Sequence, residues 1–366
     1  MQQIQQKRNN KGTSKKQNHN LEFRVIDNFA SLCEILPDWK NLYYTSGNNV
    51  FINPDFYVAW WKNIGHKSNY KWRVFMAYDK GKLVAIAPMV IRSRLGLKVI
   101  QWAGGELFDY NEVLAESAQY CEVIWSYILN YSGYNVALFK DIIQNSTCDK
   151  ELQKIATPSL YEQAYFIKLD YKNSGEWFES VSGNLRKEYS RYNKKLSSKG
   201  RVGYKVHNDA EDIKKVISCL IDQKRKWYLK KNLQGVFDYK GIEDFLNEIA
   251  RISLTDKTLH VSSVTCGDEI IAAHIGFIKN STVLWYMTSY DIEWSEYSPG
   301  RILLYEGIKW AIDNNIKEFD FLRGNAGYKR SITDSKKLLP KYVIPRGIIG
   351  KAARLIYKMN KYCLTL

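Results

Sequence analysis

The feature that most restricts the fold of this chain is an order of helices and strands that occurs twice. In the first half, helix-like spacing over residues 29–46 and 54–64 precedes three β-rich runs, WRVFMAYD, KLVAIAPMVI and KVIQWAGG. In the second half, helical stretches over 184–197, 209–230 and 241–253 precede LHVSSVTC, EIIAAHIGFI and TVLWYMTSYD. Superposing Ala85 on Ala272 aligns the two middle runs at an offset of 187 residues. A repeated order of this kind predicts a duplicated module.

The segment after TVLWYMTSYD predicts that the sheet is not purely antiparallel. A helical stretch from Ser298 to about Asn315 is followed by a further strand-like run, EFDFLRG. A strand, a helix and a second strand in this order form a parallel crossover. The predicted fold class is therefore α/β, with two tandem modules, each a mixed, mostly antiparallel sheet flanked by helices. We place the modules at residues 21–170 and 171–335.

The charge of the chain is concentrated at its ends. Lys plus Arg number 54 against 38 Asp plus Glu, a net charge of +16. Residues 1–20 hold five basic residues and no acid, and residues 336–366 hold eight basic residues and no acid. We expect the first segment to be a disordered tail and the second a basic tail or helix. The body between them is only mildly basic, which favours a small anionic ligand over a long nucleic-acid track.

Cellular location is predicted from what the sequence does not contain. The start of the chain has no apolar signal core, and no uninterrupted apolar run reaches the roughly 20 residues of a membrane span. The six cysteines show no CxxC pair, which favours a reducing compartment. We therefore expect a cytoplasmic protein. The segment GIIGKAARLIYKMNKYCL alternates apolar and basic positions at helical spacing, so it either contacts the anionic inner membrane surface or packs as a terminal helix.

The sharpest local motif is Ser298-Pro299-Gly300-Arg301 at the start of the helix RILLYEGIKWA. The first N–H groups of a helix have no partner within it and lie at its positive end, so they bind anions. Gly300 would let a phosphate approach the backbone closely. The motif predicts a pyrophosphate site, with an ordinary proline-led helix start as the alternative.

Several segments together resemble a known family. YDIEWSEYSPGRILLYEGIKWAIDNNIKEFDFLRGNAGYKR and NLRKEYSRYNKKLSSKG are similar to the C-terminal half of the CelD-like branch of the GNAT acyltransferase superfamily. FINPDFYVAWW and GGELFDYNEVL extend the resemblance to roughly residues 50–335. It implies a tandem GNAT fold, shared with the FemAB peptidoglycan-bridge enzymes, with the acyl donor bound in the second module.

The resemblance also implies where the donor binds. In GNAT proteins the strand before the anion-binding helix splays from its neighbour and pairs with the pantetheine arm of acyl-CoA. Here Met287, Thr288 and Ser289 would line that arm, and Ser298, Gly300 and Arg301 would hold the pyrophosphate. Acyl-CoA is expected as co-substrate, and no metal is expected. The SPGR motif has fewer glycine and basic residues than the usual GNAT pyrophosphate loop.

Transfer to an amine needs a neutral nucleophile, and two side chains are candidates for a proton acceptor. His274 lies in the apolar strand IIAAHIGFI; it is either a base or a core histidine. Asp320 alternates with Phe319 and Phe321 and so points to the opposite face of its strand. Its carboxylate could orient substrate or accept a proton, or it could pair with Arg323 or Lys329.

Transfer also needs stabilisation of the oxyanion and of the departing thiolate. Tyr328 and Lys329 are the predicted pair: a phenol can protonate the thiolate, and an ammonium can stabilise the oxyanion. Fem-type relatives carry an important lysine at a similar place, which supports Lys329. The alternative is an ordinary basic surface loop.

Acceptor binding is predicted in the first half, in GGELFDYNEVL. Gly104 and Gly105 suit a tight turn, and the resemblance places the following Asp109 and Tyr110 near the acceptor cleft. Gly105, Asp109 and Tyr110 are thus candidate substrate-binding residues, with a plain turn as the alternative. The amphipathic basic helix over 185–196 is either a solvated face or a receiver of acceptor phosphates.

These observations predict an acyl-CoA-dependent N-acyltransferase acting on a small amine. The expected acceptor is an amino sugar linked to a nucleotide and destined for a surface polysaccharide. One alternative is a Fem-type enzyme that transfers an aminoacyl group from tRNA to a cell-wall precursor, although no long helical arm separates the halves. Another is a non-catalytic partner of an exopolysaccharide synthase. A nucleic-acid-binding protein, suggested only by the pI of 9.3, is not favoured because no binding motif is present.

Overall fold

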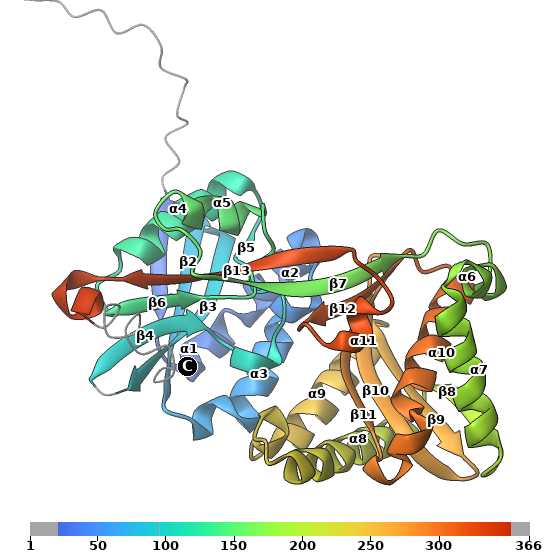
Figure 1. Ribbon diagram of the computed structural model, residues 1–366. Helices are drawn as coiled ribbons and strands as arrows, with labels where there is room; N and C mark the ends of the chain where they lie inside the picture. Colours follow the sequence, from blue (N-terminus) through green and yellow to red (C-terminus); the bar gives the residue numbers. More distant parts are fainter. Residues whose placement is uncertain (1–20, 95, 353–366) are drawn as a thin grey trace, which may run out of the picture.

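The computed structural model describes residues 21–94 and 96–352, and Figure 1 shows its two halves side by side. The first half contains β1 (Leu21–Ile26), α1 (Phe29–Glu34), α2 (Leu36–Ser46), η1 (Val50–Ile52), α3 (Pro54–Asn63), η2 (Gly65–Lys67), β2 (Tyr70–Asp79), β3 (Lys82–Arg94), β4 (Leu97–Trp102), η3 (Gly105–Leu107), β5 (Leu114–Ala115), α4 (Ala118–Asn130), β6 (Val136–Phe139), α5 (Thr147–Gln153) and β7 (Leu160–Lys168).

The second half contains α6 (Ser174–Ser180), α7 (Gly183–Ser197), β8 (Val202–His207), α8 (Ala210–Lys231), η4 (Val236–Asp238), α9 (Ile242–Thr255), β9 (Leu259–Cys266), β10 (Glu269–Lys279), β11 (Thr282–Tyr290), η5 (Ile292–Tyr297), α10 (Pro299–Asp313), β12 (Glu318–Arg323), α11 (Gly327–Arg330) and β13 (Lys336–Pro345). The prediction of three successive strands in each half is confirmed by β2–β4 and β9–β11.

Local sequence explains where the helices begin. Asn53 precedes α3, its side chain accepts a hydrogen bond from the Asp55 N–H at 3.0 Å, and Pro54 takes the first helical position. Proline suits that position because its missing N–H would have no partner within the helix anyway. The predicted start of this helix is therefore confirmed.

The strands form one continuous sheet in the order β1-β2-β3-β4-β6-β13-β7-β12-β11-β10-β9-β8, and β5 pairs with β3. In each half the meander is antiparallel, and a helix then leads to a parallel strand: β4 pairs with β6, and β11 with β12. The predicted parallel crossover after TVLWYMTSYD is thus confirmed, and α4 with β6 forms its counterpart in the first half. The mixed α/β fold class is confirmed as well.

The centre of the sheet is built from exchanged strands. β7 follows β6 in the chain but pairs with β12 of the second half. β13 follows β12 but pairs with β6 of the first half, and β7 and β13 pair with each other. In Figure 1 these two long strands run side by side across the middle of the molecule.

The expectation of a basic tail or helix over 336–366 is therefore wrong for residues 336–345, which form strand β13. The segment is covered by β6 on one side and β7 on the other, and its pairing partners lie far away in the chain. Residues 347–352 are helical. The rest of the expected terminal helix, and the expected tail over 1–20, lie outside the described residues.

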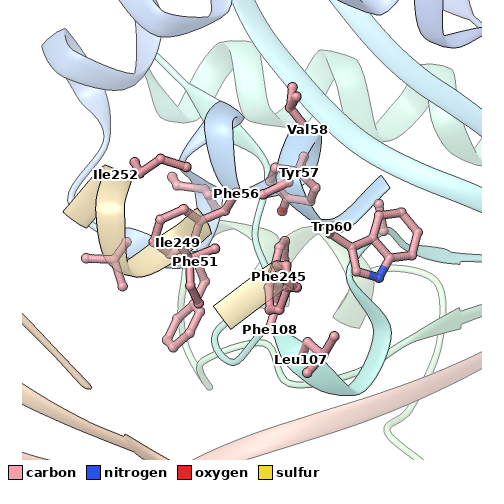
Figure 2. Close-up of a cluster of buried hydrophobic side chains, with 14 of the residues drawn as sticks. Phe51, Phe56, Tyr57, Val58, Trp60, Leu107, Phe108, Phe245, Ile249 and Ile252 are labelled. Carbon is pink, nitrogen blue, oxygen red and sulfur yellow. The ribbon is translucent and has the colours of Figure 1, made fainter. Parts of the chain in front are cut away.

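An apolar core joins the two halves. Figure 2 shows aromatic side chains of the first half, Phe51, Phe56 and Phe108 among them, packed against Phe245 of α9. The ring centroids of Phe108 and Phe245 lie 6.2 Å apart. Aromatic side chains bury large areas, so this contact resists separation of the halves. Within residues 21–94 and 96–352, no helix is both long and apolar enough to cross a membrane.

Candidate functional site

In the second half, the neighbouring strands β11 and β12 separate part-way along their length. These parallel strands pair only from Thr282 to Leu284 on β11, against Glu318 to Asp320 on β12. The remainder of β11, from residue 285 to residue 290, pairs with β10 alone among the described strands. Its other edge therefore offers backbone N–H and C=O groups to a ligand.

Helix α10 begins beside this opening. Ser298 precedes it in a left-handed conformation with a φ of 51°, and Pro299 takes the first helical position. The N–H groups of Arg301 and Ile302 both donate to the Ser298 carbonyl, at 2.9 and 3.3 Å. Among the described residues no acceptor is seen for the Gly300 N–H, so the anion-binding donor of this helix start is Gly300 rather than the whole first turn.

A cavity of about 390 Å³ lies at this place. Thr288 and Ser289 of β11, Ser298, and Gly300 and Arg301 of α10 line it. Five of the six residues predicted to bind the donor therefore lie together, and their role in binding stays a prediction. The other walls come from α8, β11, η5, α10 and α11: Gln223, Lys224, Trp227, Trp285, Tyr290, Ser295, Leu304 and Tyr328.

Two titratable side chains give this cavity its chemical character. Lys224 lies with its Nζ 5.7 Å from the ring centre of Trp227 and 5.8 Å from that of Phe237, and no described carboxylate forms an ion pair with it. Burial lowers the pKa of the Lys224 ammonium. Burial raises the pKa of the Tyr328 phenol to about 12, so the phenol carries its proton at neutral pH. Together with the Arg301 guanidinium, the cavity thus offers two cations and a phenol that can donate a proton.

Neighbouring side chains hold the Arg301 side chain through one nitrogen of its guanidinium and leave other N–H groups free. Its Nη1 donates to the Ser331 Oγ at 3.0 Å and lies 3.9 Å from the Glu188 carboxylate. A guanidinium has five N–H donors, so further donors remain for a phosphate at the cavity wall.

Met287 and His274 lie elsewhere. The Met287 side chain is buried in the core that joins the halves. His274 is fully buried, stacks on Trp285 with ring centres 3.4 Å apart, and faces His260 across 3.3 Å between their Nδ1 atoms. Burial lowers the pKa of His274 well below its ordinary value. It lines none of the described cavities, and its surroundings match the core alternative stated above.

Lys329 is buried at a bend in β12. Its Nζ donates to the carbonyls of Phe321, Leu322 and Arg323 at 2.8, 3.1 and 2.7 Å. Leu322 has a φ of 57°, and the pairing of β12 with β7 slips between Asp320 and Arg323. Phe321 and Leu322 lie in this irregular stretch, and all three ammonium donors serve the three carbonyls. In this geometry Lys329 has no donor left for an oxyanion, so its immediate role is to hold the bend.

Asp320 ties the same bend to other elements. Its carboxylate accepts the Leu322 N–H at 2.8 Å, the Lys337 Nζ of β13 at 2.6 Å, and the Tyr110 hydroxyl of the first half at 2.8 Å. The residue is fully buried. A carboxylate with three donors on it is a positioning group here, and Tyr110 acts in the sheet centre rather than on a cavity wall.

Asp109 belongs to a buried ion-pair network centred on Arg323. The Arg323 guanidinium contacts the carboxylates of Asp109, Glu106 and Asp141, the last two at 2.9 Å. Burial raises the pKa of Asp109 to about 6, and Arg323 opposes that rise. The network lies between the two halves, where sequence reasoning expected an acceptor cleft. Gly105, the third candidate, lines a separate cavity described below.

The Asp109 shift gives a testable pH dependence. Its folded pKa of about 6 exceeds the ordinary 3.8, so the folded protein holds the proton more tightly. The stabilisation from this group is complete below pH 4 and is lost as the pH rises through 6. The unfolding free energy of the native protein minus that of Asp109→Asn should fall by roughly 2 kcal/mol between pH 4 and 7, measured by urea denaturation. A constant difference would contradict the shift.

Sequence reasoning missed several cavity residues. Lys224 and Trp227 lie one turn apart near the end of α8, in KRKWYLKK, where a basic run is typical of a solvated helix face. Arg323 was considered only as a partner for Asp320. Its actual partners come from the loop after β4 and from the residues after β6, a contact that depends on how the halves meet.

Comparison with known proteins supports the fold and the domain type. Residues 183–330 match the family described as an acetyltransferase (GNAT) domain, which confirms the resemblance stated above. No curated protein sequence matches this chain.

Solved structures share the fold at low identity. L-PGS from Bacillus licheniformis has a TM-score of 0.53 at 11% identity, covering 88% of this chain and 96% of that one. FemX has a TM-score of 0.50 at 9% identity, covering 83% and 96%. The C-terminal domain of a putative lysylphosphatidylglycerol synthetase from Agrobacterium fabrum has a TM-score of 0.54 at 9% identity, covering 90% and 96%. The likeness therefore extends over both halves.

Proposed function

We propose, from the premise that residues 183–330 form a GNAT-type acetyltransferase domain, that this protein transfers an acyl group from an acyl-CoA thioester to an amine. The observation that carries the proposal is the cavity between the free edge of β11 and the start of α10. It combines an unpaired strand edge, a helix N-terminus and two basic side chains in one place.

The cavity suits an extended donor with an anionic end. The edge of β11 beyond Leu284 can hydrogen-bond to the amide groups of a pantetheine arm. The Gly300 N–H, the Arg301 guanidinium and the Lys224 ammonium can face the phosphates. An uncompensated ammonium such as Lys224 gains most from an anion, because burial has already removed part of its hydration.

Tyr328 supplies the proton that the leaving group needs. When the amine attacks the thioester carbonyl carbon, the C–S bond breaks and the sulfur departs as a thiolate. A phenol whose pKa is raised to about 12 holds its proton at neutral pH and can deliver it to the sulfur as the C–S bond breaks. The phenolate that remains takes up the proton that the amine nitrogen loses, which restores the phenol. We assign Tyr328 as the general acid and Lys329 as the residue that positions the β12 bend beside it.

The finer substrate assignment follows from the sequence. We propose an amino sugar linked to a nucleotide as the acceptor, with the product destined for a surface polysaccharide and the reaction taking place in the cytoplasm, at or near the inner membrane face. The mild positive charge of the central body favours an anionic acceptor of this kind.

Calorimetry with a panel of acyl-CoA thioesters tests the proposal. Acetyl-, propionyl-, butyryl- and longer-chain acyl-CoAs are titrated into the full chain, with free coenzyme A as the reference. Binding of at least one thioester, together with a rise in the melting temperature, is the expected result. Absence of heat with every thioester at millimolar concentration would refute the donor assignment.

Replacing Tyr328 with phenylalanine should separate binding from turnover. The aromatic ring remains in the cavity wall, so acyl-CoA affinity should change less than about threefold, a difference under 1 kcal/mol. Turnover should fall by about 100-fold or more, the ordinary contribution of a general acid. Release of coenzyme A, measured with a thiol reagent and an amine acceptor, gives both parameters. Full turnover would exclude Tyr328 as the acid.

A second candidate is transfer of an aminoacyl group, because the fold is shared with FemX and L-PGS over most of both chains. The basic face of α7, with Lys187, Arg191 and Lys194, would then contact tRNA. Filter binding with charged tRNA distinguishes the two candidates. Tight tRNA binding without acyl-CoA binding would favour the second.

A further inference from the structure

A second cavity, of about 450 Å³, lies in the first half of the molecule. Its floor is the end of β4, at Gln101, and the start of the segment after β6, at Lys140. Tyr239 and Lys240 from the second half close one side of it. The cavity therefore requires both halves, and none of the donor-site residues lines it.

This cavity and the donor cavity each lie near the end of the third strand of a meander. Gln101 aligns with Thr288 at the offset of 187 residues, and each residue lies near the end of the third strand of its meander. The two sites differ in one respect: Gln101 still pairs with Leu138 of β6, whereas Thr288 lies beyond the last pair of β11 with β12, at Leu284. Each half of the molecule thus has a cavity near the end of its third meander strand.

The basic residues of the second cavity exceed its acids. Lys67, Arg92, Lys140 and Lys240 line it, and Glu106 is the one carboxylate among its lining residues. Lys140 forms an ion pair with Glu106. No described carboxylate lies within ion-pair distance of Lys67, Arg92 or Lys240, so three cations face this space without a partner.

The nearby acids cannot neutralise them. Glu106 and Asp141 are both bound to Arg323 at 2.9 Å, and Asp109 also contacts that guanidinium. The three carboxylates of this network face two cations, Arg323 and Lys140, so the network leaves one negative charge against the three unpaired cations. The surplus positive charge is therefore left for a ligand with at least two negative charges.

Flat side chains surround the same space. Trp60, Tyr70 and Tyr239 line the cavity, and the Arg92 guanidinium lies 5.9 Å from the centre of the Tyr70 ring. Aromatic faces and guanidinium planes stack on planar rings, and guanidinium groups bind phosphate through paired N–H donors. Gly105 adds an open approach to the backbone, because a Cβ there would meet no atom within 4 Å.

We propose that this second cavity is a binding site for a nucleoside diphosphate group, with Lys67, Arg92 and Lys240 on the phosphates and Tyr70, Tyr239 or Trp60 against the base. The assignment deepens the proposed function, since a nucleotide-linked acceptor would carry this group. It concerns binding alone, so it is measured without the transfer reaction.

Calorimetric titration of the full chain with ADP, GDP, CDP and UDP tests the site. Inorganic pyrophosphate is a separate probe of the phosphate part of the ligand, and the four nucleosides are separate probes of its base and sugar. At least one nucleoside diphosphate should bind more tightly than pyrophosphate and than its own nucleoside. Arg92→Gln and Lys67→Ala should each weaken that binding about tenfold or more, because each removes a charged phosphate contact.

Matched variants exclude binding elsewhere. Lys62→Ala removes an exposed lysine of α3 that does not line the cavity and should leave the affinity unchanged. Gly300→Tyr obstructs the donor cavity, where the adenosine diphosphate part of coenzyme A would bind, and should also leave it unchanged. The proposal is overturned if no nucleoside diphosphate binds at millimolar concentration, if Gly300→Tyr abolishes the binding while Arg92→Gln does not, or if Lys62→Ala weakens it equally.

Discussion

Replacing Lys329 with methionine should lower the free energy of unfolding by about 3–5 kcal/mol, the ordinary cost of removing one partner of a buried charge. The methionine fills similar space but donates no hydrogen bond. Three buried carbonyls, those of Phe321, Leu322 and Arg323, would lose their partner. The carboxylates of Asp109 and Asp320, which stabilise the charged form of this buried ammonium, would lose a nearby cation as well. Urea denaturation followed by tryptophan fluorescence measures the change.

Lys336→Met is the matched control, because Lys336 is exposed and the same substitution there removes no buried bond. It should change the stability by less than about 0.5 kcal/mol. A loss below 1 kcal/mol for Lys329→Met would show that the three carbonyl bonds do not hold the bend. Turnover per folded molecule then tells whether Lys329 also acts directly, which stays a prediction.

Replacing Gly300 with tyrosine should weaken acyl-CoA binding by about 100-fold or more, a free-energy change of about 2.7 kcal/mol. The new side chain would stand beside the one unpartnered N–H at the start of α10 and enter the donor cavity. Gly300 is not required by the fold: its φ is not positive, and a Cβ would meet its nearest atom, in the Tyr290 ring, at 3.4 Å. The stability should therefore change little.

Gly300→Ala is a smaller substitution at the same position and gives a second value of acyl-CoA affinity to compare with the native protein. Alanine fits the same space, and removing a glycine from a helix should raise stability by about 0.5–1 kcal/mol. If a phosphate lies against this backbone, the alanine variant should still bind acyl-CoA more weakly than the native protein does. Equal acyl-CoA affinity in the native, alanine and tyrosine proteins would place the pyrophosphate elsewhere.

The sequence predicted the elements that carry their own pattern. β9 was expected at its exact bounds, and α8, α10 and β10 within two residues, because their apolar spacing and turn residues are local signals. β13 was missed because KKLLPKYVIP contains two prolines and three lysines, which argue against a central strand. Its burial comes from β6 and β7, and such pairing cannot be read from the segment alone.

For the candidate site as well, local motifs could be predicted from the sequence, whereas contacts formed by folding could not. The SPGR motif located the start of α10, and the resemblance brought five donor-binding candidates to one cavity. Lys329 was selected as a functional lysine, but its three bonds to carbonyls arise from the bend in β12, which depends on Asp320 and Leu322. Lys224, Arg92 and Arg323 carry much of the electrostatics, yet they differ from other basic residues only through the neighbours that folding gives them.

The exchange of β7 and β13 has a consequence for synthesis on the ribosome. β6 is made early, but its neighbour on one side is β13, which is far later in the chain: Phe139 pairs with Tyr342. Loop-closure entropy must be overcome before such a distant pairing stabilises the chain, so this sheet should close late and slowly. Until then β6 and β7 each expose an unpaired edge, and the nascent protein would depend on chaperones to avoid joining the edges of other molecules.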